Sequence, residues 1–87
     1  MDLQNGWLKC QVTEGMLPME YAVSCNTIDG NVISFFVSEE YIDSQNNLVQ
    51  VGVMECKNDS CLIYVPSDPL EGVSRTVMVS TNDMVDM

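Results

Sequence analysis

Four cysteines, Cys10, Cys25, Cys56 and Cys61, offer the widest range of chemistry in this 87-residue chain. Four thiolates can hold zinc in a tetrahedral site. The familiar zinc and redox sites use a Cys-x-x-Cys pair, which this sequence lacks. We therefore favour free thiols that pack as small hydrophobic groups. One or two disulfides, or a zinc site made by all four cysteines, remain as alternatives.

The spacing also pairs these cysteines across two predicted hairpins. Cys10 and Cys25 lie opposite each other if the first turn is centred between residues 17 and 18. Cys56 and Cys61 flank a predicted four-residue loop at 57–60 in the same way. Cross-strand neighbours have Cβ atoms about 4.5–5.5 Å apart, which is longer than the ~3.8 Å that a disulfide prefers. This difference favours thiols over bridges.

Residue types that serve general acid–base or nucleophilic catalysis are scarce. The chain has no histidine, so it lacks the usual base near neutral pH and the usual nitrogen ligand for metals. Glu39 and Glu40 are adjacent, so on a strand they point to opposite faces, whereas paired catalysis needs two carboxylates converging on one bond. The five glycines form no phosphate-binding loop. We expect no enzyme activity and no cofactor.

The charge balance narrows the choice of partners. Three cationic residues against thirteen acidic ones give a net charge of -10, which repels nucleic-acid backbones. No apolar run approaches the ~20 residues needed to span a bilayer, and the N-terminus carries no signal peptide pattern. We expect no nucleic-acid partner, no membrane association, and a cytoplasmic location whose reducing conditions keep thiols free.

The elements that must position these residues are strands. Apolar and polar residues alternate with a period of two in most segments, and Asp29-Gly30 marks a tight turn. Between 32 and 37 apolar residues fall on both faces, which indicates a strand covered on both sides or a bulge. Single helical turns are predicted near 38–40 and 81–84. The predicted strands are 8–13, 21–27, 32–37, 48–56, 61–65 and 74–80.

Five or six antiparallel strands in so short a chain predict an all-β fold closed into a small barrel, because closure removes exposed sheet edges. The barrel is expected to be one domain covering residues 5–86. The segment 75–85, read as strand, helical turn and short strand, resembles the end of SH3-like small barrels, and the hairpin 53–63 is similar to their distal hairpin. The OB-fold is the alternative, with residues 38–47 supplying a short helix.

The resemblance carries over no peptide-binding residues, because the family's early Ala-Leu-Tyr-Asp-Tyr-like segment and its tandem Trp are absent. A binding surface is instead predicted from an acidic segment with an apolar centre, together with the Trp that opens the first strand. Such a surface suits a basic protein or peptide, since complementary charge steers encounter. Its residues are Trp7, Glu39, Glu40, Tyr41 and Asp43.

Two further observations bear on this surface. Tyr41 and Ile42 could instead plug one end of the barrel. Met16 and Met19 lie in a predicted turn, where methionine forms an adaptable contact surface or fills a gap. The sequence therefore predicts a non-catalytic binding or assembly module, either monomer or homodimer. The alternative is a small metal-binding or redox protein that uses its cysteines.

Overall fold

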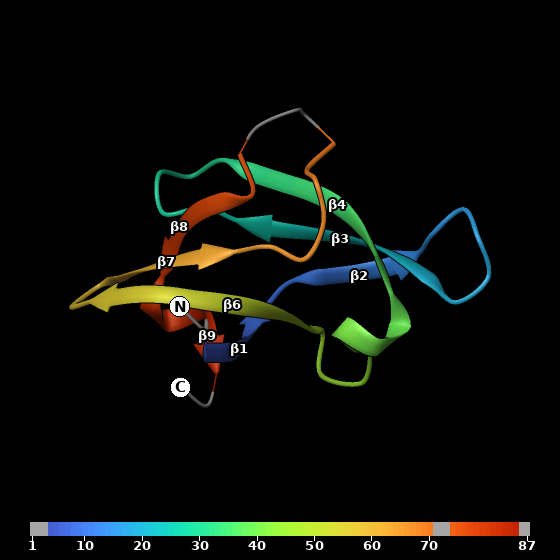
Figure 1. Ribbon diagram of the computed structural model, residues 1–87, viewed down its shortest axis with the longest axis horizontal. Helices are drawn as coiled ribbons and strands as arrows, with labels where there is room; N and C mark the ends of the chain where they lie inside the picture. The colour runs from blue at the N-terminus through green and yellow to red at the C-terminus, as the bar shows by residue number, and fades with distance from the viewer. Residues whose placement is uncertain (1–3, 71–73, 86–87) are drawn as a thin grey trace.

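The computed structural model describes residues 4–70 and 74–85, and within these ranges the fold is all-β (Figure 1). Two 3-10 turns, η1 (Glu39–Tyr41) and η2 (Thr81–Asp83), are the helical elements there, and neither approaches the length and apolarity of a bilayer-crossing helix. The strands are β1 (Gln4–Lys9), β2 (Gln11–Glu14), β3 (Glu20–Asn26), β4 (Val32–Ser38), β5 (Ile42–Asp43), β6 (Leu48–Lys57), β7 (Ser60–Tyr64), β8 (Thr76–Ser80) and β9 (Met84–Val85).

The strands form two antiparallel sheets. The larger one has the order β8-β7-β6-β1-β9, with β5 also paired to β6, and the smaller one has the order β2-β3-β4. The sequence η2 then β9 at the end of the chain matches the predicted helical turn and last short strand. The predicted turn at Asp29-Gly30 is also present, with Gly30 at a positive φ of 88°.

The chain passes from the larger sheet to the smaller one at Cys10. The segment 8–13 was predicted as one strand, but β1 ends at Lys9 and β2 begins at Gln11. The backbone N–H of Cys10 turns away from β3 and donates to the carbonyl of Asn47 at 3.0 Å. The prediction of one strand is therefore wrong, because a local alternation of apolar and polar residues is compatible with two strands in different sheets.

The two sheets enclose a core made from alternate residues of each long strand. Phe35 is its largest fully buried side chain, and neighbouring Phe36 is half-buried on the other face of β4. The register of β4 against β3 is regular, so the bulge considered for this strand is absent; a bulge lies instead in β6 between Val53 and Glu55. The core residues are Leu8, Val23, Cys25, Ile33, Phe35, Val37, Val49, Val51, Cys61, Ile63, Val65, Val77, Val79 and Met84.

The sheets do not join into a closed barrel, which corrects that part of the prediction. β4 is an edge of the small sheet and β8 an edge of the large one, and no ladder joins them. Single hydrogen bonds fasten this seam: Ile28 N–H donates to Met78 O at 2.9 Å, and Leu70 N–H donates to Ser34 O at 2.8 Å. Turn and loop residues thus take the place of a continuous ladder.

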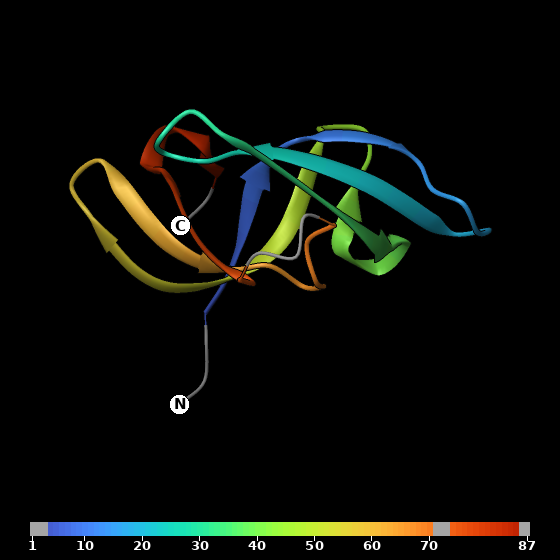
Figure 2. The ribbon, with the colours of Figure 1, turned by 90° about the horizontal axis from the view of Figure 1, so that it is seen from above.

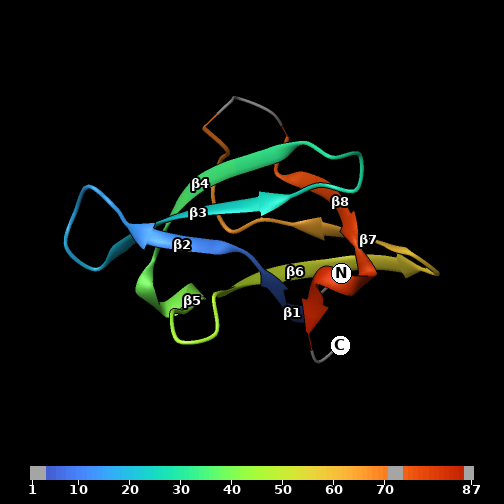
Figure 3. The same ribbon diagram turned by 180° about the vertical axis from the view of Figure 1, so that it is seen from behind.

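Two hairpins mark opposite ends of the molecule. The turn between β2 and β3 extends from one end and the turn between β6 and β7 from the other, as views from the front, above and behind agree (Figures 1, 2 and 3). The principal extents are 38 × 25 × 25 Å, so these turns lie along the long axis. Side chains at each turn are therefore presented well away from the core.

Candidate functional site

The turn between β2 and β3 concentrates exposed apolar side chains. Met16 is 85% exposed, and Leu17 and Met19 are each 65% exposed. These three residues, with Pro18 between them, form what we call the apolar tip. Folded chains scatter single apolar residues over their surface, but contiguous exposed apolar groups mark interaction sites. The apolar tip is thus a candidate contact surface.

Glu20 holds the tip in a defined shape. Its carboxylate oxygen Oε1 accepts from the backbone N–H groups of Met16 and Leu17, each at 3.3 Å. Its own N–H donates to Leu17 O at 3.2 Å, and its carbonyl accepts from Gly15 N–H at 2.9 Å. Four hydrogen bonds to one residue restrict the backbone of the turn. Because the turn is already ordered, binding a partner through its apolar side chains would cost less conformational entropy.

The acidic 3-10 turn η1 lies against this tip. The N–H of Glu39 donates to the carbonyl oxygen of Met19 at 3.0 Å, which joins η1 to the β3 side of the tip. Glu39 and Glu40 are both exposed, and Glu14 is exposed on β2. Three exposed acidic residues thus lie on the segments that flank the apolar tip. We call the apolar tip with Glu39 and Glu40 the tip surface.

Few cations oppose this negative charge. In the described part of the chain the one ion pair joins Lys57 to Glu55 at 3.8 Å, on the opposite hairpin. Arg75 stacks on the Tyr64 ring at 4.4 Å and donates Nε–H to Val65 O. Among the described residues, Glu14, Glu39 and Glu40 therefore take part in no ion pair.

The predicted binding residues fall in three places. Glu39 and Glu40 join the tip surface, as described above. Trp7 and Asp43 line one hollow of about 590 Å³, and the Asp43 carboxylate accepts from the backbone and side-chain nitrogens of Asn46, which closes a turn. Tyr41 lines a different hollow of about 200 Å³ and packs against the core. A binding role for these five residues stays a prediction.

Met16, Leu17 and Met19 were not grouped with the predicted site. The sequence marks residues 14–18 as a turn through its glycine and proline, and the apolar residues in and beside a turn were the available signal. The contact between this turn and η1 continues the register of the β3–β4 hairpin, because the step after Glu20–Ser38 brings Met19 opposite Glu39.

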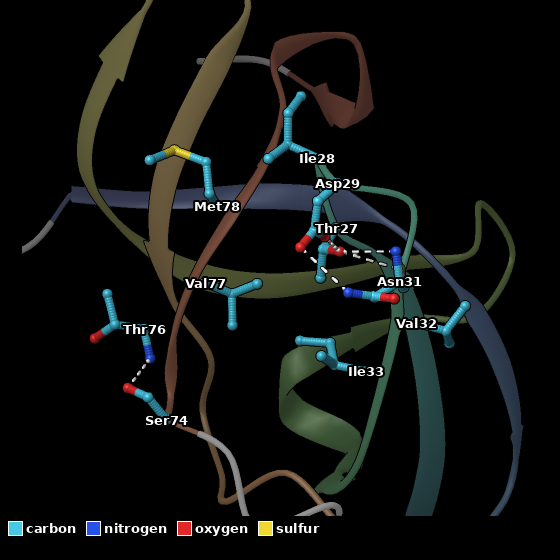
Figure 4. A pocket seen from close by; sticks show the side chains of 10 residues that line it. All are labelled: Thr27, Ile28, Asp29, Asn31, Val32, Ile33, Ser74, Thr76, Val77 and Met78. Carbon is cyan, nitrogen blue, oxygen red and sulfur yellow. Dashed lines mark hydrogen bonds between the residues drawn. The ribbon is translucent and has the colours of Figure 1, made fainter.

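A groove of about 500 Å³ opens on the seam between β4 and β8 (Figure 4). Its lining is mostly apolar or hydroxylic, and Asp29 is the one ionisable residue among the described residues that line it. Thr27 Oγ1–H and Asn31 Nδ2–H donate to the Asp29 carboxylate. These hydrogen bonds, the one from Thr27 foremost, lower the pKa of Asp29 from its usual value. Asp29 therefore closes its turn as a carboxylate.

The cysteines divide into one bridge and one thiol pair. Cys56 and Cys61 are directly opposite in the β6–β7 hairpin, with Cα atoms 4.0 Å apart, and form a disulfide. The prediction of free thiols is thus wrong for this pair, because their Cα separation is shorter than the average cross-strand distance on which that prediction relied. The turn between them has two residues, Asn58 and Asp59, where four were expected. Cys10 and Cys25 are free.

The alternative of a four-cysteine zinc site does not hold in this arrangement. Two of the four sulfurs are joined in the bridge, and in the part of the chain that the structure describes no three His, Cys, Asp or Glu residues gather as a metal site would require. In comparisons with known proteins, no family model, no curated protein and no solved structure matches the chain significantly.

Proposed function

We propose that this protein is a non-catalytic binding or assembly module that docks through the tip surface onto a partner protein. The partner would offer an apolar cleft rimmed by Lys or Arg side chains. The observation that supports this proposal is the backbone hydrogen bond from Glu39 to Met19, which joins a turn with two exposed glutamates to a hairpin tip with exposed apolar side chains.

The apolar tip would supply most of the affinity. Burying a leucine or methionine side chain is worth about 1.5–3 kcal/mol, and two or three such side chains entering a cleft would make a small hot spot. The carboxylates of Glu39 and Glu40 would lie at the rim. Rim charges mainly raise the association rate and give a salt-dependent affinity. A partner whose apolar cleft is rimmed by Lys or Arg therefore complements both the apolar tip and the glutamates.

Several finer expectations belong to this proposal. An SH3-like affiliation is supported by the order β8, η2, β9 at the chain end and by the β6–β7 hairpin. A cytoplasmic location, the absence of a cofactor and a state of monomer or homodimer are retained as expectations. Self-association through the tip surface is disfavoured, because two copies would bring like charges together, each chain carrying -10.

The proposal can be tested with a random peptide library displayed on phage and selected on the immobilised protein. Selected peptides are expected to combine Lys or Arg with apolar residues. A synthetic peptide of the strongest sequence should then bind with an affinity that falls as salt rises. Selection of peptides with no cationic bias, or an affinity insensitive to salt, would contradict the proposal.

Variants assign the binding to the tip surface. Leu17→Ser should weaken the selected peptide by about 1–2 kcal/mol, which is roughly 5- to 30-fold in Kd. Leu70→Ser is the matched control, because Leu70 is 57% exposed but lies in the loop after β7. The double variant Glu39→Gln/Glu40→Gln should flatten the salt dependence. Equal loss in Leu17→Ser and Leu70→Ser would place the contact elsewhere.

A further inference from the structure

The free cysteines Cys10 and Cys25 form a facing thiol pair at the base of the β2–β3 hairpin. The ladder aligns Gln11 with Ser24, so the next step of the same register aligns Cys10 with Cys25. Directly opposite residues of a ladder point to the same face, so both side chains turn to the same side, and both cysteines pack in or against the core. The Cys10 thiol also donates to the carbonyl oxygen of Asn47 at 3.5 Å.

The position in the ladder favours a bond between them. Gly15 N–H donates to Glu20 O, and hydrogen-bonded and non-hydrogen-bonded pairs alternate from there along the hairpin. Counting down the ladder makes Cys10 and Cys25 a non-hydrogen-bonded pair, the kind with the shorter Cα separation of about 4.5 Å. Cys56 and Cys61, also directly opposite each other, already form a bridge at a Cα separation of 4.0 Å.

The two thiols differ in access and acidity. Cys25 is 2% exposed, whereas Cys10 is half-buried and lines two hollows, both of which also include Lys9. A hydrogen bond with the Cys25 thiol lowers the pKa of Cys10, against the opposing effect of partial burial. The same interaction, then burial and the charges of Cys10 and Asp83, raise the pKa of Cys25. Cys10 is thus the thiol that ionises and meets a reagent first.

We propose that Cys10 and Cys25 are a thiol–disulfide exchange site for small-molecule disulfides. The Cys10 thiolate attacks one sulfur of the reagent, its S–S bond breaks, and one thiolate leaves while a mixed disulfide forms on Cys10. Cys25 then loses its proton and attacks the Cys10 sulfur, and the second thiol leaves. In sum, two protein thiols are oxidised to one disulfide and one small disulfide is reduced to two thiols.

The test exposes the folded protein to oxidised glutathione and follows its intact mass. The wild-type chain should lose two hydrogens and retain no glutathione. Cleavage after glutamate then identifies the bond, because Glu14 and Glu20 separate Cys10 from Cys25, and Glu55 leaves Cys56 and Cys61 on another peptide. A bridge between the peptide ending at Glu14 and the peptide beginning at Tyr21 is the expected product.

Single variants separate the two roles. Cys25→Ser should accumulate glutathione on Cys10, and Cys10→Ser should react at least about tenfold more slowly, since exchange needs an accessible thiolate. Circular dichroism and reaction in urea, where Cys25 is exposed, show whether each variant is folded. Retained glutathione on wild-type protein, or equal rates for Cys10→Ser and wild type in the folded state, would overturn the proposal.

Discussion

The backbone N–H of Glu39 donates to the carbonyl oxygen of Met19, and this bond of 3.0 Å joins the acidic 3-10 turn to the apolar hairpin tip. Met19 itself has a positive φ of 61°, so its carbonyl is aimed by an unusual backbone conformation. The shape of the tip therefore depends on the backbone on both sides of the turn. A substitution that distorts this backbone should therefore weaken docking even when it removes no side chain that contacts the partner.

Gly15→Ala should distort the tip. A Cβ at this position would lie 2.8 Å from the carbonyl oxygen of Glu20, which is backbone and cannot swing away. Overpacking of this kind costs about 1–3 kcal/mol of unfolding free energy. We expect both a lower denaturation midpoint and weaker binding of the library-selected peptide, measured by calorimetry.

Gly30→Ala is the control for this change. Gly30 has a φ of 88°, which an alanine adopts only with strain, but nothing lies within 4 Å of the added Cβ. It should lower stability by about 1–2 kcal/mol, the usual cost of a left-handed alanine, and leave peptide binding unchanged. Equal binding losses in the two variants would mean that the tip shape does not matter.

Cys56→Ser should lower the stability of the chain by removing the hairpin bridge. A disulfide that closes so short a loop is worth about 2 kcal/mol in the chain-entropy account. Cys56 is exposed and Cys61 is fully buried, so this change keeps the core sulfur in place. Urea unfolding with and without dithiothreitol measures the effect. Wild type and Cys10→Ser should lose stability on reduction, whereas Cys56→Ser should not respond.

The sequence predicted strands better than it predicted their partners. The register of Cys10 against Cys25 followed from the turn position, and the small sheet has that register. The exchange of sheets at Cys10 was missed, since alternation reports which face is buried but not which sheet is joined. The bridge between Cys56 and Cys61 was missed because an average cross-strand distance hides the closer, non-hydrogen-bonded positions.

The candidate site was predictable only in part. Glu39 and Glu40 were identified from their local composition, and both belong to the tip surface. Tyr41 and Asp43 follow them in sequence, yet the structure places them in separate hollows. Tyr41 ends the 3-10 turn η1 whereas Asp43 lies in β5, so no single side-chain repeat relates the two residues. The apolar tip meets η1 because Met19 and Glu39 extend the register of the β3–β4 hairpin, whose turn at Asp29-Gly30 was predicted but whose register was not followed to its end.

Phe35→Ala and Phe36→Ala should differ strongly, although the residues are adjacent. Phe35 is fully buried between the sheets, and its truncation should cost about 3–5 kcal/mol through lost burial and the cavity left behind. Phe36 is half-buried on the outer face of β4, so its truncation should cost roughly half as much or less. Urea denaturation measures both. Similar losses would show that β4 is covered equally on its two faces.

Asp29 should make the stability of the chain depend on pH in the acid range. Its pKa is lowered in the folded state, chiefly by the hydrogen bond from Thr27, so the folded state favours the ionised carboxylate. The resulting stabilisation is fully present above the usual aspartate pKa and is lost as the pH falls through the lower, folded-state value. Asp29→Asn should therefore be less stable than wild type at pH 7, and the difference should shrink on acidification.

Thr27→Val tests whether this hydrogen bond is the cause. The substitution keeps the side-chain shape but removes the hydroxyl that donates to Asp29. At pH 7, Asp29→Asn should lower the midpoint of thermal unfolding less in the Thr27→Val background than in the wild-type background. The effect of Asp29→Asn should also depend less on pH in the Thr27→Val background. If the effect of Asp29→Asn keeps its full size and pH dependence without the hydroxyl, the carboxylate is stabilised by another group, with Asn31 as the next donor to substitute.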